Sequence, residues 1–479
     1  MMIMKSLIKC VVLSLVIGVP QGCDLVDPTE VINPNIVQDV VVGTPNSTTL
    51  IIVGLDRQMA AVYNGLVDIA EVGSDNYVNT QTFFNQNFDV LDIQFKDTDI
   101  NTLQARIANL RVGAEFGIND IYPGDNVSTQ AQLAELNFYH GWSLLLAGEM
   151  FNALPAEGET AAISSSANIA LAITDFQAAE AIDGTNASYK MALARAYYVS
   201  GDKANAVIKA NEAIAIDAAY LRAVEYDAIN GPTSTIQDAL QDRGNFDDYQ
   251  PLPSLDFLDP KAYARPGGTE ESPTYIQKIE EAHLILAEAQ IADSDLPGAR
   301  QTMKDIIALV GTRVKDTFDD SVEGRTNEMA ENRPDTVTTM VRYGTEPFRS
   351  GLVLNRLNGD VTVGTISDTS LDDAYVDALL TEDAVLEGLY LLRQEIFMAE
   401  GRRFTDLGIK LPVSEVEMLS NSLISASDVL ASVPSFLPLD MDAITYDAST
   451  PGSETCTITY NMNAVLAANK TDAAVLPFH

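Results

Sequence analysis

The feature that most restricts the fold is a run of small residues near the middle of the chain. Residues 189–217 read YKMALARAYYVSGDKANAVIKANEAIAID. Four alanines flank a turn signal at Gly201-Asp202, namely Ala192, Ala196, Ala204 and Ala213. Small side chains at helical spacing let two antiparallel helices approach closely. The segment therefore predicts a helix, a short turn and a second helix, a unit that buries its apolar face by stacking on neighbours.

Two further segments follow the same plan. Residues 280–310 read EEAHLILAEAQIADSDLPGARQTMKDIIALV, with a turn at Asp295–Gly298, and Ser166–Ile182 has the character of the second helix of another unit. The order of helix, short turn and helix matches the tetratricopeptide repeat. The sequence therefore predicts a mostly α fold on a tetratricopeptide-like helical-repeat scaffold, with units at about 166–217 and 275–310.

Other parts of the chain predict single helices or loops. Helical periodicity covers Leu50–Val72, Asp99–Phe116 and Ser128–Phe151, where Thr129 and Gln132 form a capping pattern and Trp142 lies on the apolar stripe. Three long segments lack that periodicity, namely 244–273, 315–373 and 434–469. We expect long irregular loops with a few short strands there, and long loops in a compact protein are usually functional.

The charge of the chain excludes one class of partner. The 479 residues are 46% hydrophobic, enough for a large core, but the net charge is −39. A protein that binds nucleic acid needs a basic surface to neutralise phosphates. The composition therefore predicts no nucleic-acid partner.

The first residues carry a targeting signal. MMIMKSLIKCVVLSLVIGVPQGC has two lysines and then a short apolar run, which predicts a secretory signal peptide over residues 1–22. The Gly22-Cys23 pair resembles the cleavage site of a bacterial lipoprotein, so Cys23 is the predicted lipidation site and residues 23–48 a tether. Ordinary signal cleavage, which leaves Cys23 unmodified, is the alternative.

Catalytic motifs are missing from the sequence. The sequence contains no GxSxG, HExxH, GxxxxGK[ST] or GxGxxG motif. A calcium loop beginning at Asp293 fails because its twelfth position is Lys304. His140 and His283 fall in apolar helices, where a hydrogen-bonded structural role is the commoner one. We therefore expect no enzyme, no metal and no cofactor, with a hydrolase using scattered carboxylates as the alternative.

Residues 392–407, LRQEIFMAEGRRFTDL, place six charges among apolar residues of one predicted buried helix. Helical spacing would put Arg393 and Glu400 on one face and would pair Glu400 with Arg403 and Arg402 with Asp406. Gly401 would leave room for a neighbouring helix. We interpret the charges as a buried ion-pair network between helices, and catalysis by Glu395 and Glu400 is the alternative.

These motifs occur in an order that resembles one family. GCDLVDPTE, VGSDNYV, AELNFYHGWSLLLAGEMFNALP and EEAHLILAEAQ precede the charged segment, and KLPVSEVEMLSN follows it. The series resembles the SusD/RagB family of outer-membrane nutrient-binding lipoproteins. The family motif in the charged segment corresponds to Arg393, Glu395, Phe397, Glu400, Gly401, Arg402, Phe404, Asp406 and Leu407.

The resemblance spans residues 23–421. It implies a SusD-like α-helical domain over residues 49–421, and residues 422–479 form a C-terminal extension beyond the usual end. His140, Gln394 and Gly408 depart from the family pattern.

The resemblance also implies a function. Family members are lipid-anchored on the extracellular face of the outer membrane and deliver a glycan or oligosaccharide to a SusC-like TonB-dependent barrel transporter. Aromatic rings in the loop at 244–273 are the candidate ligand contacts, namely Tyr249, Phe257 and Tyr263, and anchoring of the loop is the alternative role for them. A peptide ligand, or a tetratricopeptide-type assembly role without a nutrient, are the alternatives.

Overall fold

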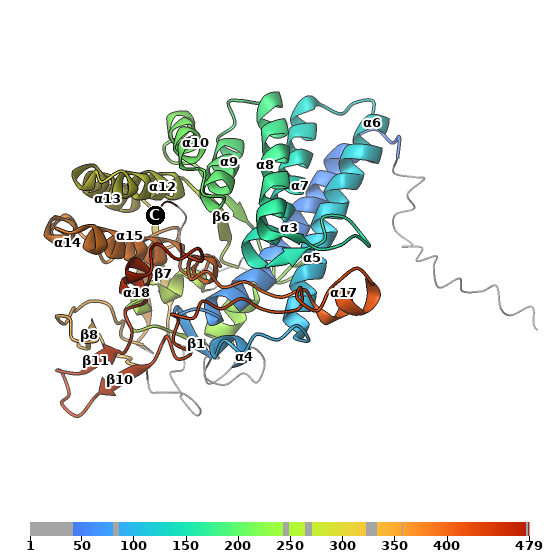
Figure 1. Ribbon diagram of the computed structural model, residues 1–479. Coiled ribbons are helices and arrows are strands. Elements are labelled where there is room, and N and C mark those ends of the chain that lie inside the picture. The colour runs from blue at the N-terminus through green and yellow to red at the C-terminus, as the bar shows by residue number, and fades with distance from the viewer. Residues whose placement is uncertain are drawn as a thin grey trace, which may run out of the picture.

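The computed structural model describes residues 42–79, 86–242, 249–263, 271–321, 333–356, 358–475 and residue 478. The predicted signal peptide, Cys23 and most of the predicted tether lie outside the described residues. Helical hairpins make up one side of the molecule, and short strands and irregular segments make up the other (Figure 1).

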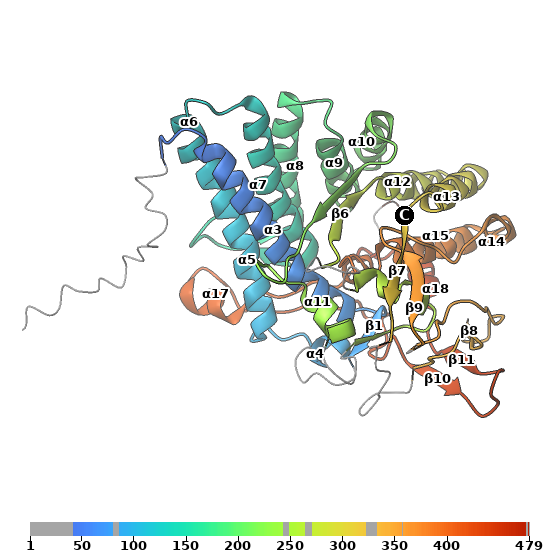
Figure 2. The same ribbon diagram turned by 180° about the vertical axis from the view of Figure 1, so that it is seen from behind.

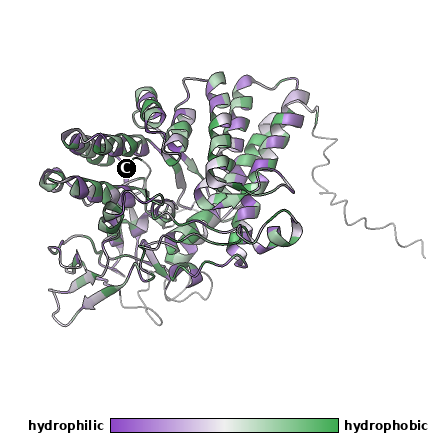
Figure 3. Ribbon diagram, viewed as in Figure 1, coloured by the Kyte–Doolittle hydropathy of each residue, from purple (hydrophilic) through white to green (hydrophobic). Residues whose placement is uncertain are grey.

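Consecutive helices pack in three antiparallel hairpins that follow one another across the molecule, and the two helices after them pack on the last hairpin (Figure 1). The bounds of these helices are α7 Gln130–Met150, α8 Ser165–Ile182, α9 Ala187–Val199, α10 Lys203–Ile216, α12 Ile279–Ala292, α13 Leu296–Val310, α14 Asp373–Ala378 and α15 Glu382–Phe397. This arrangement confirms the mostly α fold with tetratricopeptide-like units. Figure 3 shows hydrophobic and hydrophilic residues alternating along these helices, as stacked amphipathic hairpins require.

Two long helices complete the helical side. Helix α3, Ser47–Val72, crosses the molecule and packs against α5, Thr98–Phe116, and against α7 (Figure 2). The remaining helical segments are short: α4 Gln86–Asp89, the π-helical turn Gly117–Ile121, α6 Tyr122–Gly124, α11 Thr235–Gln237, the π-helical turn Asp238–Asp242, the 3₁₀ segment Asp256–Ala262, α16 Arg403–Asp406, α17 Glu415–Ser420 and α18 Met462–Ala468.

The described strands form small sheets that join distant parts of the chain. Antiparallel pairs are β1 (Tyr77–Asn79) with β5 (Tyr249–Pro251), β2 (Ala153–Leu154) with β3 (Ile163–Ser164), β4 (Leu221–Val224) with β6 (Thr274–Lys278), and β7 (Lys315–Asp319) with β9 (Asp360–Gly364). The three-stranded sheet runs β10 (Ile444–Asp447), β11 (Thr455–Ile458) and β8 (Met340–Tyr343), with β11 parallel to β8. The predicted C-terminal extension therefore contributes two strands to the body of the protein.

Most of the local sequence signals in the helical hairpins are confirmed. Thr129 and Gln132 form the capping box of α7, and the Trp142 side chain is 0% exposed, its indole N–H donating to the Tyr63 hydroxyl. In the α9–α10 hairpin Ala192, Ala196 and Ala213 are buried, but the prediction for Ala204 is wrong because that residue is exposed. The α10 positions that face the hairpin core are instead one helical turn apart, at Ala206 and Ala210.

The prediction of one continuous helix over residues 392–407 is also wrong. Helix α15 ends at Phe397, and the backbone turns through positive φ at Ala399 (60°) and Gly401 (72°) before α16 begins at Arg403. A Cβ at position 401 would overlap the Leu66 side chain of α3. Glycine is therefore favoured at position 401 for two reasons: the backbone is left-handed there, and α3 approaches closely. The sequence predicted only the close approach.

The break in the helix redirects its charges toward separate partners. Arg393 Nε lies 2.8 Å from Asp406 Oδ2, and Arg402 Nη2 lies 2.5 Å from Glu281 Oε1 on α12. Glu400 Oε1 lies 2.5 Å from Lys261 Nζ and 2.9 Å from Lys278 Nζ, while Arg403 binds both carboxylate oxygens of Asp75. The buried ion-pair network is confirmed, but the pairs predicted within the helix are wrong.

The alternative of catalysis by Glu395 and Glu400 has no support in the surroundings of these groups. Glu395 accepts hydrogen bonds from the Thr369 hydroxyl and from the Ser370 hydroxyl and N–H, and Glu400 binds the two lysines. Both side chains are buried. Each carboxylate is engaged by the protein itself and has no face open to a substrate.

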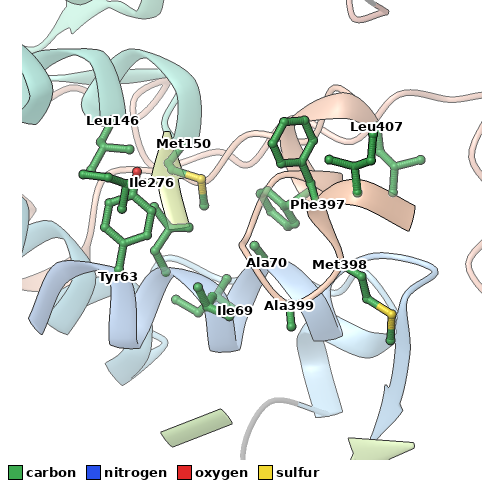
Figure 4. Close-up of a cluster of buried hydrophobic side chains, with 14 of the residues drawn as sticks. Tyr63, Ile69, Ala70, Leu146, Met150, Ile276, Phe397, Met398, Ala399 and Leu407 are labelled. Carbon is green, nitrogen blue, oxygen red and sulfur yellow. The ribbon is translucent and has the colours of Figure 1, made fainter. Parts of the chain in front are cut away.

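Apolar contacts surround this network. Figure 4 shows the side chains of Phe397, Met398 and Ala399 close to Ile69 and Ala70 of α3. Tyr63 of the same helix faces Leu146 and Met150 of α7 and Ile276 of β6, all of them buried. The turn after α15 is therefore where the long helix, the hairpins and a strand meet.

The two roles of Gly401 can be separated by mutation. Gly401→Ala adds both left-handed strain and overlap with Leu66, so we expect a loss of about 2–5 kcal/mol in the free energy of unfolding. Gly452→Ala is the matched control, because Gly452 has φ 80° but nothing within 4 Å of an added Cβ, and it should lose about 1–2 kcal/mol. Urea denaturation measures both, and equal losses would contradict the steric role.

Two buried carboxyl groups favour their neutral form. Burial raises the pKa of Glu71 to about 7, against hydrogen bonds from Asn76 and the Gly401 N–H that lower it. Burial likewise raises the pKa of Glu288 to about 7, although the Tyr198 hydroxyl donates to it. Because these pKa values lie above the 4.5 of an exposed glutamate, each group stabilises the fold fully below pH 4.5, and that contribution is lost as the pH rises through about 7.

Glu288→Gln tests this pH dependence. The amide keeps an acceptor for Tyr198 but cannot ionise, so relative to the wild type the variant should gain about 3 kcal/mol between pH 4.5 and pH 8. Thermal denaturation across this range, converted to the free energy of unfolding, gives the difference. Glu225→Gln removes a charge from an exposed glutamate and should show no such trend. Parallel pH profiles for the wild type and Glu288→Gln would contradict the assignment.

Candidate ligand-binding site

A narrow pocket, with a cavity volume of about 30 Å³, opens in the strand-bearing half of the molecule. Figure 1 places β8, which lines the pocket, and its neighbour β11 at the opposite end of the molecule from α7 and α8. Its lining combines charged, amide and aromatic groups, namely Ser254, Val341, Arg342, Tyr343, Glu346, Pro347, Arg349, Leu352, Tyr375, Glu387, Leu391, Asn461 and Asn463. A concave surface with a few converging polar groups is the usual form of a small-ligand site.

The C-terminal part of the chain completes this pocket. Strand β11 pairs with β8 in parallel, and the chain then enters α18, which packs on α15. Asn461 is the N-cap of α18, and its side-chain oxygen accepts from the Ala464 N–H. The same residue therefore starts the helix and faces the pocket.

The Asn461 amide joins two carboxylates. Its Nδ2 donates to Glu346 Oε1 at 2.8 Å and to Glu387 Oε1 at 2.7 Å. Glu346 follows β8 and is exposed, while Glu387 lies on α15 and is half-buried. Since both carboxylates approach one nitrogen, they face each other across the amide.

This arrangement changes the acidity of the pocket groups. Burial raises the pKa of Glu387; the hydrogen bond from Asn461 lowers it, and the nearby charge of Glu346 raises it further. Burial also raises the pKa of Tyr375 to about 12, with a further contribution from Glu387. After burial, the charge of Glu346 therefore contributes to the raised pKa of Glu387, and the charge of Glu387 to that of Tyr375.

The arginines of the pocket are held by the protein itself. The Arg342 guanidinium lies 4.4 Å from the centre of the Phe348 ring, and Arg342 Nε donates to the Thr457 hydroxyl. Arg349 lies 5.7 Å from the centre of the Tyr375 ring and donates to the Ser370 hydroxyl and carbonyl. Each guanidinium covers one face of an aromatic ring, which reduces the stacking surface open to a ligand.

The buried network extends to this pocket. Asn463, on the first turn of α18, accepts from Arg403 Nη1 and donates to Gln394 Oε1. Gln394 in turn donates to Asp75 and Asn76. The motif residues around α15 and α16 therefore fix the position of α18, and through it Asn461.

The aromatic residues predicted to contact a ligand lie elsewhere. Tyr249 is 3% exposed in β5, and Tyr263 is 0% exposed, with its hydroxyl bonded to Asp259 and Arg356. Phe257 is partly buried and packs on the core. This geometry favours their role as anchors of the loop rather than as ligand contacts. The sequence reasoning missed Glu346, Glu387 and Asn461, which lie in three separate segments and share no motif.

Two other residues singled out in the sequence, His140 and Lys304, each contact a carboxylate of the protein itself. His140 Nδ1 lies 2.8 Å from Asp175 Oδ2, which agrees with a hydrogen-bonded structural histidine. Lys304 lies 2.7 Å from Asp377 and not near a calcium loop. Within the described ranges, no three His, Cys, Asp or Glu side chains come together in a way that could hold a metal ion.

The fold can be compared with known structures. The crystal structure of a SusD superfamily protein from Bacteroides fragilis has a TM-score of 0.53 and 13% identity, covering 80% of this chain and 99% of that protein. A SusD-like protein from Bacteroides fragilis has a TM-score of 0.55 at 10% identity, covering 82% of this chain and 98% of that one. This chain has the SusD-like fold. The fold that the sequence motifs implied is therefore confirmed.

A third solved structure matches this chain over a similar share of its length. It comes from Bacteroides vulgatus, is described as a candidate sugar binding protein, and has a TM-score of 0.55 at 13% identity, covering 79% of this chain and 97% of that protein. No protein-family model matches the sequence, and no curated protein matches it either. The SusD-like fold is therefore present here at only 10% to 13% sequence identity. At such low identity the role of a side chain in a relative does not transfer to this chain.

Asn461→Asp tests how the pocket is held together. Asp is as good an N-cap as Asn, but it replaces the shared donor with a third carboxylate beside Glu346 and Glu387. We expect a loss of about 1–3 kcal/mol in the free energy of unfolding at pH 7, recovered at about pH 4 where the carboxylates protonate.

Asn186→Asp is the matched control for this substitution. Asn186 caps α9 in the same way, with its side chain accepting from the Ser188 N–H, and it has no bridging role between two carboxylates. Its free energy of unfolding should change little at either pH. A similar pH dependence in both variants would mean that capping, and not the shared donor, is what Asn461 contributes.

Proposed function

We propose that this protein is a cell-surface nutrient-binding lipoprotein of the SusD/RagB type. In this role it is anchored through Cys23 to the outer membrane, captures oligosaccharides, and delivers them to a SusC-like TonB-dependent transporter. The observation that carries the proposal is the SusD-like fold over about four-fifths of the chain, together with the motif order around Arg393–Asp406.

The pocket at β8, β11 and α18 supports a binding function. It is concave, it presents hydrogen-bonding groups on different segments, and it lies away from the α7–α8 hairpin. In this proposal the pocket takes the ligand and leaves the surfaces of these hairpins free for a protein partner.

In this proposal the membrane attachment is a lipid. No helix in the described part of the chain is long and apolar enough to cross a membrane. In the proposal the attachment comes from acyl chains on Cys23, because each buried methylene contributes about 0.8 kcal/mol and several chains together give stable anchoring.

The proposal predicts a stable complex in native membranes. We expect gentle detergent extraction of the outer membrane, followed by affinity capture of the full-length protein, to recover a TonB-dependent barrel in about a one-to-one ratio. Cys23→Ala should release the protein from the membrane, because in this proposal the acyl chains are attached to Cys23. Thermal denaturation of the released protein checks that its fold is intact. Recovery of a different partner, or of none, would contradict the uptake role.

A further inference from the structure

A closed loop projects from the body of the protein after the charged segment. The Val413 N–H donates to the Asp428 carbonyl, with 2.9 Å between the two atoms, and this bond closes the fourteen residues of 414–427 into an Ω-loop that contains α17. Figures 1 and 2 show α17 at the edge of the molecule. Compact loops whose ends are held together in this way are frequently functional.

The apolar side chains of this Ω-loop fall into two sets. Ile424, in the loop, and Val429, just after it, are partly buried and pack on the core, so they anchor the loop. Val416, Leu419 and Leu423 are 56%, 75% and 56% exposed, and no residue of α17 is buried. Positions 416 and 419 are three apart and share one face of α17. The second set therefore forms an apolar patch that anchoring of the loop does not require.

The charges around this patch favour a protein partner over a lipid surface. The charged residues of the stretch 411–432 are Glu415, Glu417 and Asp428, and the stretch contains no lysine or arginine. A segment that lies on a membrane surface typically combines its apolar face with lysine and arginine. A protein interface has an apolar centre and a polar rim, and its charges are complementary to those of the partner. The acidic border therefore fits an apolar protein surface that is bordered by lysine and arginine.

The Ω-loop lies on the side of the molecule at which the described chain begins. A Cβ added at Gly124 of α6 would lie 3.0 Å from Gly43 N, so the first described residues pack beside α6. Both ribbon views place α6 and α17 on the side opposite α14 (Figures 1 and 2). The eighteen residues 24–41 separate Cys23 from this point and span at most about 65 Å. With the lipid on Cys23, this side is the one nearest to a partner in the membrane.

From these observations we infer that the patch formed by Val416, Leu419 and Leu423 docks on the outer-membrane transporter, at an apolar surface bordered by lysine and arginine. The inference rests on the proposed function and adds to it the surface through which this chain meets its partner. Exposed apolar patches with a polar border are typical of such contacts. The acidic border also predicts that the contact weakens as the salt concentration rises.

Photo-crosslinking in native membranes tests the contact directly. Leu419 of the full-length lipidated protein is replaced by benzoylphenylalanine, the outer membranes are irradiated, and the adducts are identified by mass spectrometry. Leu380 is the matched control, because it is 76% exposed against 75% for Leu419 and lies beside α14 on the opposite side. We expect the probe at position 419 to form an adduct with the same barrel that affinity capture recovers, and the probe at position 380 to form none.

Charged substitutions measure how much the patch contributes. Leu419→Asp and Leu423→Asp should each lower the amount of barrel captured about tenfold or more, because an apolar residue at the centre of an interface contributes most of its binding energy. Leu380→Asp should leave the capture unchanged. All three side chains are exposed, so the fold should tolerate the changes, and circular dichroism of each variant checks this.

The outcomes separate this inference from the proposed function. If the barrel is captured but the probe at position 419 forms an adduct with lipid, with another protein or with nothing, the docking surface is wrong and the uptake role stands. Equal adducts from positions 419 and 380, or unchanged capture by Leu419→Asp and Leu423→Asp, would also overturn the docking surface. Absence of the barrel from both experiments would remove the proposed function and the docking surface with it.

Discussion

The ammonium groups of Lys261 and Lys278 meet on one oxygen of Glu400 in a part of the core that water does not reach. Lys278 also donates to the carbonyls of Ile366 and Ile396, and Lys261 to that of Met398, so the two lysines close the C-terminal end of α15. Three acceptors around Lys278 require its protonated form, whereas burial lowers the pKa of this amine to about 7. The 3₁₀ segment, β6 and α15 are held in one geometry because none of these groups could be left without its partners.

How much of this the sequence predicts depends on whether the signal is local. The hairpins, the Thr129 capping box and the buried Trp142 follow from periodicity and caps, and all of them are present. The end of α15 could not be predicted in this way, because LRQEIFMAEGRRFTDL has helical composition. Tertiary contacts override that local preference, since Arg402, Arg403 and Glu400 bind partners on three other segments.

The residues of the pocket could not be predicted from the sequence either, because tertiary contacts and not a local pattern bring them together. Glu346, Glu387 and Asn461 lie far apart in the chain, and each is an ordinary surface residue until β11 pairs with β8 and brings them together. The aromatic residues of the irregular loop were more conspicuous in the sequence. Burial of Tyr249 and Tyr263 shows that a loop rich in aromatic residues can serve as an anchor, so composition alone does not separate a binding loop from a structural one.

The parallel pairing of β8 with β11 also sets an order of events during synthesis. Strand β8 is made more than a hundred residues before the partner that positions the pocket, whereas the two helices of the α7–α8 hairpin, and those of the α9–α10 hairpin, pack on a partner that is close in the chain. The hairpins can therefore form as the chain emerges, but Glu346 and Glu387 have no shared amide until Asn461 has been made. A chain that stops before residue 461 would keep much of the helical scaffold and lack the pocket, so the last part of the protein to be synthesised decides whether the pocket forms.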